Sequence, residues 1–238
     1  MEKLEANPSL PVRCLALWLV MLALAGCDQA PPPATAKPEP AVDFNATKTK
    51  AEQGDAAGQN TLGDLYARGS GIPQDYTNAA KWYRLSAEQG FAAAQCNLAA
   101  LYAAGAGVTN DAAEAVKWYR QAADKGSADA QYNLAQMLSV GRGAKRDARE
   151  AIRLYQLAAE QGDGLSQYNL ARRYREGKDV PADAVQAYFW FTLAGANGVA
   201  DAVPMRKILK KDMTRGQIAE AERKAAEFKS KASKVNPR

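Results

Sequence analysis

The stretch Ala115-Val-Lys-Trp-Tyr-Arg-Gln-Ala-Ala-Asp-Lys-Gly126, with Ala130-Gln-Tyr-Asn-Leu-Ala135 just after it, carries the pattern on which the architecture rests. Its characteristic residues return along the chain at steps of 36. The matching columns are Gly54, Gly90, Gly126, Gly162 and Gly198; Gln59, Gln95, Gln131 and Gln167; Leu62, Leu98, Leu134 and Leu170; Ala79, Ala115, Ala151 and Ala187; and Tyr83, Tyr119, Tyr155 and Phe191. Several columns in one register without an insertion identify a repeat protein.

Each repeat reads as two helices joined by a glycine loop. In the first repeat, apolar and small residues at helical spacing predict a first helix over Asp55–Arg68. Gly69 and Gly71 end this helix, because glycine adopts the left-handed conformation of a helix C-cap. One aspartate per repeat starts the second helix, and in three repeats Glu or Gln follows three residues later, as in a capping box. These aspartates and their partners are Asp75, Asp111 with Glu114, Asp147 with Glu150, and Asp183 with Gln186.

Residues 1–26 have the pattern of a secretory signal peptide. Two basic residues precede an apolar run over 14–25, which is shorter than the roughly 20 residues that span a bilayer. The junction Leu24-Ala25-Gly26-Cys27 resembles the lipobox of bacterial lipoproteins. This resemblance implies cleavage before Cys27 and acylation of its thiol, so that lipid holds the chain at the membrane. An uncleaved signal anchor is the alternative.

Asp28, directly after the cysteine, resembles the inner-membrane retention signal of enterobacterial lipoproteins. We therefore expect the protein at the inner rather than the outer membrane, facing the periplasm. The Pro-rich stretch that follows has no hydrophobic period and suits an extended spacer. The expected organisation is a signal peptide (1–26), the lipidated Cys and linker (27–42), a half-repeat helix plus four repeats (43–198), and capping helices with a basic tail (199–238).

The composition removes several classes of active site. The chain has no histidine, so the commonest general base and metal ligand is absent. Of the three cysteines, Cys14 belongs to the signal peptide and Cys27 to the lipid site, which leaves Cys96 without a disulfide partner. A nucleophilic cysteine needs a basic partner, and Cys96 has no histidine to serve as one. We expect no catalytic residue, no metal and no cofactor apart from the covalent lipid on Cys27.

The net charge of +5 is concentrated at the C-terminus. Met205–Arg238 holds 11 Lys or Arg against 4 Asp or Glu, whereas residues 27–205 hold 18 against 20. The basic segment reads as a solvated helix face, with contact to anionic lipid as the alternative. Nucleic acid is not an expected partner of an exported protein.

Together with Ala87-Glu-Gln-Gly90 and the Gly-x-Gly loops, the stretches quoted above resemble the Sel-one-like repeat, a relative of the tetratricopeptide repeat. The resemblance covers about 51–198. The fourth repeat departs from the pattern, with Asp179 in place of the second loop glycine. Its Tyr188–Ala196 stretch and the following Met213–Phe228 resemble the last repeat and the closing helix of many bacterial members. Thr214 and Gln217 predict the N-terminal cap of that closing helix.

This resemblance implies an all-α, right-handed α-α superhelical solenoid of helix-turn-helix repeats whose first helices line a concave groove. In tetratricopeptide repeats, residues two, five, nine and thirteen of the first helix face that groove. The same register selects Asn60, Cys96, Tyr132 and Tyr168 at the fifth position and Asp64, Ala100, Gln136 and Arg172 at the ninth. The candidate partner-binding residues are Asn60, Asp64, Arg68, Tyr132, Gln136, Tyr168, Arg172 and Arg175. Plain solvent-facing surface is the alternative for each of them.

The function that follows is that of a membrane-anchored, exported adaptor that binds a protein partner in the cell envelope through the groove. An accessory role in polysaccharide or peptidoglycan assembly is the alternative, because Tyr132 and Tyr168 would suit stacking on sugars. A third possibility is β-lactam hydrolysis, described for cysteine-rich relatives. The paired cysteines of those relatives and a Ser-x-x-Lys motif are both missing here.

Overall fold

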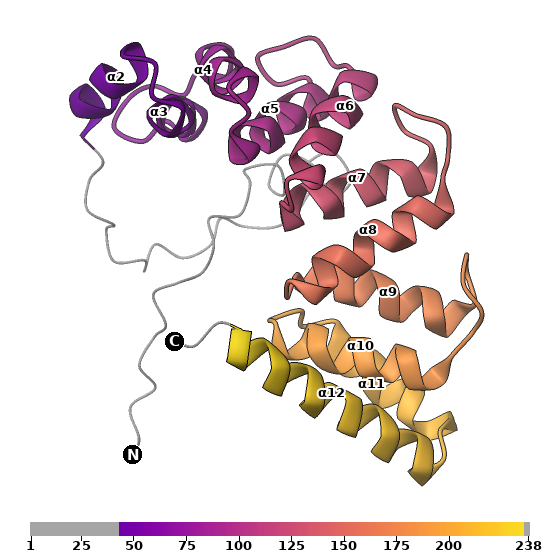
Figure 1. Cartoon of the computed structure of the whole chain (residues 1–238). Helices are drawn as coiled ribbons and strands as arrows, with labels where there is room; N and C mark the ends of the chain where they lie inside the picture. Colours follow the sequence, from indigo (N-terminus) through magenta and orange to yellow (C-terminus); the bar gives the residue numbers. More distant parts are fainter. Residues whose placement is uncertain (1–42, 236–238) are drawn as a thin grey trace, which may run out of the picture. The chain divides into compact units, whose positions relative to one another are not determined.

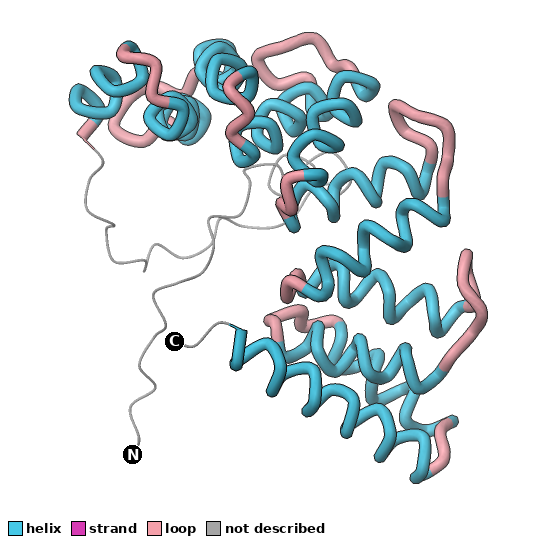
Figure 2. Tube along the Cα trace, viewed as in Figure 1, coloured by secondary structure: helices cyan, strands magenta, loops and turns pink. Residues whose placement is uncertain are grey.

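The structure is a computed structural model that describes residues 43–235 (Figure 1). Over this range the chain consists of helices and connecting loops and contains no strand (Figure 2). The predicted all-α class of helix-turn-helix repeats is therefore confirmed. The signal peptide, Cys27 and the Pro-rich linker lie outside the described residues, so the expectations about them stay predictions.

Helices follow one another in consecutive pairs, and each helix from α3 to α10 is 13 residues long. Their bounds are α2 (Phe44–Glu52), α3 (Ala56–Arg68), α4 (Tyr76–Glu88), α5 (Ala92–Ala104), α6 (Ala112–Asp124), α7 (Ala128–Val140), α8 (Ala148–Glu160), α9 (Gly164–Glu176), α10 (Ala184–Ala196), α11 (Ala202–Leu209), η1 (Lys210–Asp212) and α12 (Arg215–Val235). The chain divides between Trp118 and Tyr119 into two compact units. We call the described parts, 43–118 and 119–235, the first and the second unit.

The loop after each first helix turns on two left-handed residues. Gly69, Gly105, Gly141 and Gly177 cap the helices with φ of 67°, 71°, 77° and 66°. At the second loop position, Gly107 has φ of 67°, and a Cβ there would lie 2.2 Å from the carbonyl carbon of Tyr76. Asp179 holds the same conformation in the fourth repeat with φ of 65°, although a side chain is disfavoured there. The fourth loop therefore needs contacts that hold Asp179 in place.

The aspartate caps of the second helices form only in part as predicted. Asp75, Asp147 and Asp183 each accept the backbone N–H three residues later at 2.9 Å, and Asp111 does so at 3.0 Å. A capping box has a second hydrogen bond, from the backbone N–H of the aspartate to the side chain of the Glu or Gln three residues later. The prediction of this second bond is wrong for these helices. The backbone N–H of each aspartate donates instead to a carbonyl of the preceding helix, at 2.9–3.0 Å. Because that donor is already used, the Glu114 and Glu150 side chains pair with Lys117 and Arg153.

At the start of α12 the full capping box forms. The Thr214 backbone N–H donates to Gln217 Oε1 at 2.9 Å, and the Gln217 N–H donates to Thr214 Oγ1 at 3.2 Å. The helix then packs on α10 (Figure 1). There Phe228 meets the rings of Phe189 and Trp190 edge-on. The predicted closing helix is confirmed, and it covers the apolar face of the last repeat.

Buried glutamines tie each first helix to the helix before it. Their Nε2 groups donate to a carbonyl oxygen eight residues earlier at 2.9–3.2 Å, in Gln59, Gln95, Gln131 and Gln167. In three repeats the glutamine Oε1 also accepts from an amide 30 residues later, in the pairs Gln89–Gln59, Gln161–Gln131 and Asn197–Gln167 at 2.7–2.9 Å. A polar column inside an alanine-rich core is stable because its hydrogen bonds are made. The column also fixes the register of neighbouring helices.

Candidate functional site

In the first unit, the candidate residues of α3 belong to a polar cluster that three helices build. Asp64 Oδ1 accepts from the Tyr83 hydroxyl at 2.7 Å and from Asn97 Nδ2 at 3.3 Å. Asp64 Oδ2 accepts from Asn60 Nδ2 at 3.3 Å, and Asn60 Oδ1 accepts from Asn97 Nδ2 at 3.1 Å. Asn60 and Asp64 are half-buried. The cluster therefore holds one carboxylate in a fixed position at the edge of the core.

Burial raises the pKa of Asp64 above its ordinary value, although the Tyr83 hydrogen bond and the charge of Arg68 act in the opposite direction. Arg68 lies in the last turn of α3 and is exposed. Its cation is favourably placed near the negative end of the helix dipole. This surface presents a desolvated acidic group with an exposed arginine one turn away.

The same two columns are buried in the second repeat. Cys96 at the fifth position is 0% exposed and Ala100 at the ninth is 1% exposed, both on α5. Neither side chain reaches the surface. The register of the tetratricopeptide groove thus does not give an accessible residue in every repeat, and the Cys96 thiol is closed to a substrate.

In the second unit, Tyr132 and Gln136 lie on α7 and touch each other. The Tyr132 hydroxyl accepts from Gln136 Nε2 at 2.5 Å, and its ring packs edge-on against Tyr155 with centroids 6.1 Å apart. Tyr132 is only 6% exposed, and burial raises its pKa. Its ring therefore acts mainly in packing, and the partly exposed Gln136 is the member of this pair that a partner can reach.

The other candidates of the second unit lie on α9. Tyr168 is half-buried, with its ring edge-on to Phe191 at 5.6 Å. Arg172 and Arg175 are exposed and share one carboxylate, that of Glu176, at 3.5 Å and 3.3 Å. Two guanidinium groups on one carboxylate leave a surplus of positive charge at this end of α9.

A neighbouring set of residues was not among the candidates. Asp179 accepts from Arg173 Nη1 at 2.6 Å. It also accepts from Arg146, which lies in the loop between α7 and α8. Burial opposes its ionisation, but the Arg146 hydrogen bond and the charges of both arginines hold the pKa of Asp179 below its usual range. The Arg173 guanidinium also lies over the Tyr155 ring at 5.4 Å. These contacts hold Asp179 in its left-handed conformation.

Residues of this set depart from the repeat pattern of the sequence. Arg173 occupies the column of Leu65, Leu101 and Met137, all of which are buried. A charged residue at a core column of one repeat indicates a local partner for that charge. The departure at Asp179 was visible in the sequence, whereas its pairing with Arg146 and Arg173 was not.

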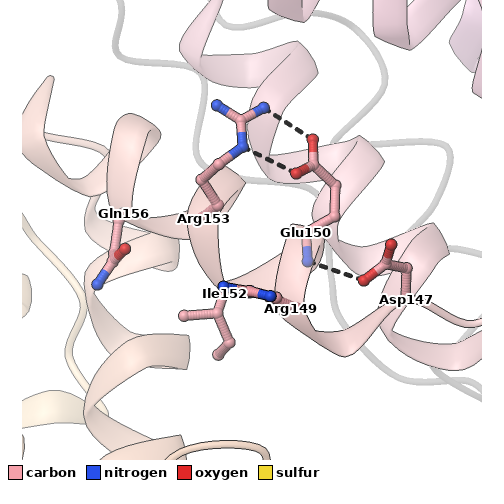
Figure 3. Close-up of a pocket in the computed structure, with 6 residues that line it drawn as sticks. All are labelled: Asp147, Arg149, Glu150, Ile152, Arg153 and Gln156. Atoms are coloured by element: carbon pink, nitrogen blue, oxygen red, sulfur yellow. Dashed lines mark hydrogen bonds and ion pairs between the residues drawn. The ribbon is translucent and has the colours of Figure 1, made fainter.

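A surface hollow on α8 offers no free acid for catalysis at Glu150 (Figure 3). Arg153 donates to both Glu150 carboxylate oxygens at 2.7 and 2.8 Å, as the dashed lines show. This hydrogen-bonded pair lowers the pKa of Glu150 and raises the pKa of Arg153. A carboxylate held ionised by a bidentate arginine is a structural group rather than a proton donor.

Among residues 43–235, no group of three or more His, Cys, Asp or Glu is placed to hold a metal ion. In the same range, no helix has both the length and the apolar character needed to cross a bilayer.

Comparison with known proteins gives a consistent picture. The profile of the Sel1 repeat family matches residues 56–91, 92–127, 128–163 and 164–199. A Sel1 repeat protein from Oxalobacter formigenes is 32% identical over 69% of each chain, with a TM-score of 0.63. A protective antigen of uropathogenic Escherichia coli with an SLR fold is also 32% identical, with a TM-score of 0.53. That match covers 78% of this chain but only 48% of the antigen. No curated protein matches. Since the four family matches run without a gap from residue 56 to residue 199, the chain belongs to the Sel1 repeat family.

Proposed function

We propose that this protein is a membrane-anchored, exported adaptor that binds a protein partner in the cell envelope through the first helices of its repeats. Sel1 repeats form scaffolds for protein–protein interaction, which is the general part of this role. The lipobox at Leu24–Cys27 supports the anchor, and Asp28 supports the inner membrane.

One observation carries the proposal. The glutamine and leucine packing columns keep one residue type in all four repeats, whereas the ninth position of the first helix is Asp64 in the first unit and Arg172 in the second. Both side chains are at least partly exposed, on helices of identical length. A scaffold that keeps its packing and varies its accessible charges suits a partner whose own charges differ along its length.

The chemistry at the two positions is specific enough to select such a partner. Asp64 presents a desolvated carboxylate, which favours a cationic or N–H donor group of the partner. Arg172 and Arg175 present planar guanidinium groups, which bind carboxylates in a bidentate manner. Arginine is also common among the residues that dominate binding energy at interfaces.

The buried rings favour a protein partner over a glycan. Stacking on a sugar needs an open aromatic face, and Tyr132 is 6% exposed. Tyr168 is half-buried beside Phe191. A role in β-lactam hydrolysis has no support from Cys96, which is 0% exposed.

Site-specific photo-crosslinking in cells tests the proposal. A photoreactive amino acid replaces Arg68 or Arg172 on the first helices, and matched controls replace Lys117 or Arg120, which are also exposed but lie on α6. We expect the same envelope protein to be crosslinked from positions 68 and 172 and not from positions 117 and 120. Crosslinks from the α6 positions alone would contradict the assignment to the first helices.

A further inference from the structure

Helix α11 leaves branched apolar side chains in solvent. It packs through Ala202 and Leu209, which are 0% and 9% exposed, and it contacts α10. Val203, whose Cγ2 borders Gly195 of α10, is 51% exposed, and Ile208 is 50% exposed. Among residues 43–231, the other large hydrophobic residues that are exposed are Leu85 at 45% and Val140 at 74%, and they are isolated in sequence. Two on one helix of eight residues indicate a surface that contacts something apolar.

Lysines lie among these apolar residues. Lys207, Lys210 and Lys211 are all exposed. On an α-helix Lys207 lies about 40° from Val203 and Ile208 lies about 140° from it, so the two apolar side chains border one exposed face with Lys207 between them. Within the described residues none of the three lysines forms an ion pair. We call Val203, Pro204, Lys207, Ile208, Lys210 and Lys211 the α11 face.

The surrounding segment has a net positive charge. Residues 201–215 contain five Lys or Arg and two Asp. Arg206 points to the packed side, where its guanidinium lies 5.9 Å from the centre of the Tyr188 ring. On α12, by contrast, Arg223 and Lys224 are neutralised by Glu227 and Glu220 at 2.6 and 3.1 Å. The unpaired positive charge of the C-terminal region therefore includes the α11 face.

We propose that the α11 face binds the surface of an anionic lipid bilayer. The lysines contact phosphate groups, and Val203 and Ile208 enter the headgroup layer. Basic residues beside exposed apolar side chains are the combination that places a helix in the membrane interface. Nucleic acid would satisfy the lysines but would leave the two branched side chains in water, so the observed pairing favours lipid. The inference does not depend on the lipid at Cys27 or on the proposed partner.

A local probe tests this in the full chain, whatever other parts of the chain bind to vesicles. Ile208→Cys carries an environment-sensitive fluorophore, and Leu85→Cys, 45% exposed on α4, is the matched control. Cys14 and Cys27 are replaced by serine, and Cys96 is buried and stays unlabelled. The probes are phosphatidylcholine vesicles with and without 30 mol% phosphatidylglycerol, and a 20-base-pair DNA duplex.

We expect a blue shift of the label at position 208 with anionic vesicles only, and no shift of the label at position 85. High salt should remove the shift, because screening is strong at exposed charges. Replacing Lys207, Lys210 and Lys211 by Gln should weaken binding about hundredfold, at about fivefold per lysine. Absence of the shift, an equal shift with neutral vesicles, or a shift with DNA but not with vesicles would each overturn the proposal. Circular dichroism confirms that the variants keep their helices.

Discussion

The two units carry the same repeat framework and opposite accessible chemistry. In both, aspartates cap the second helices and buried glutamines join neighbouring helices. The first unit then places a desolvated carboxylate, Asp64, at the position where the second unit places Arg172. The difference between the units shows that the repeated columns make the fold, and that the accessible charges come from columns that vary between repeats.

The same contrast appears in two aspartates whose environments differ. Asp64 lies among neutral donors, and burial raises its pKa. Asp179 lies between Arg146 and Arg173, which lower its pKa against the effect of burial. One carboxylate is therefore costly to ionise in the folded protein, and the other stabilises the fold when ionised.

The largest expected effect tests whether the frameworks are equal. Leu98 in the first unit and Leu134 in the second are 0% and 1% exposed at the same column. Changing either to Ala should lower the free energy of unfolding by about 2–5 kcal/mol, since each leaves a cavity in the core. Urea denaturation measures both. A loss within this range at one leucine and outside it at the other would show that the two frameworks are not equivalent.

A smaller effect concerns the loop that breaks the repeat pattern. Asp179→Gly removes the partner of Arg173, whose side chain is 12% exposed, and should cost about 1–3 kcal/mol. Adding Arg173→Leu restores the residue types of the other repeats, Leu and Gly, and should recover most of the loss. Denaturation of both variants and of Arg173→Leu completes a double-mutant cycle. If the double variant is as unstable as Asp179→Gly alone, the arginine pairing does not explain the aspartate in the loop.

Opposite pH dependences are expected for the two aspartates. The folded pKa of Asp179 is lowered, so its stabilisation is present above the unfolded value of about 3.9 and is lost as pH falls through the folded pKa. The folded pKa of Asp64 is raised, so its contribution is present below about 3.9 and is lost as pH rises through the folded pKa.

The quantity to compare is the free energy of unfolding of each variant minus that of the unaltered protein. As the pH rises from 3 to 7, this difference should fall for Asp179→Asn and should rise for Asp64→Asn. Urea denaturation at several pH values gives both slopes. Slopes of the same sign would remove the distinction between the two sites.

The smallest effect on stability is expected at the proposed binding surface. Arg172 is exposed and paired with Glu176 at 3.5 Å, so Arg172→Ala should change the free energy of unfolding by less than about 0.5 kcal/mol. Loss of an interface anchor should nevertheless weaken capture of the crosslinked partner by about 2 kcal/mol. Lys117→Ala on α6 is the control and should leave capture unchanged. The reverse result would place the binding surface on the second helices.

Much of the fold was predictable because each repeat gives an independent reading of the same position. Four aspartates and four glycines in register identify helix starts and ends, and the structure confirms them. The candidate site was harder to predict, since a column shows where a residue lies but not what its side chain reaches. Tyr132 belongs to a variable column, yet it turns into the core against Tyr155.

Polar partners that lie far apart in sequence were also beyond prediction. The capping-box glutamates were expected to reach back to the aspartate N–H groups, but carbonyls of the preceding helix occupy those donors. The Asp179 pairing depends on an arginine 33 residues away. The hydrogen-bond partners of these groups depend on which groups are close in three dimensions and on competition among donors. The repeat pattern of the sequence shows neither.

The glutamine column has a consequence for how such a chain changes its length over evolution. Its hydrogen bonds join residues separated by 8 and by 30 positions, and both separations recur in successive repeats. Duplication or loss of 36 residues leaves every one of these separations intact, whereas insertion of one residue inside a helix turns one partner away by about 100° and leaves a buried amide unpaired. Gene duplication in whole units is thus the tolerated route to a longer or shorter chain, and small insertions are confined to the exposed loops.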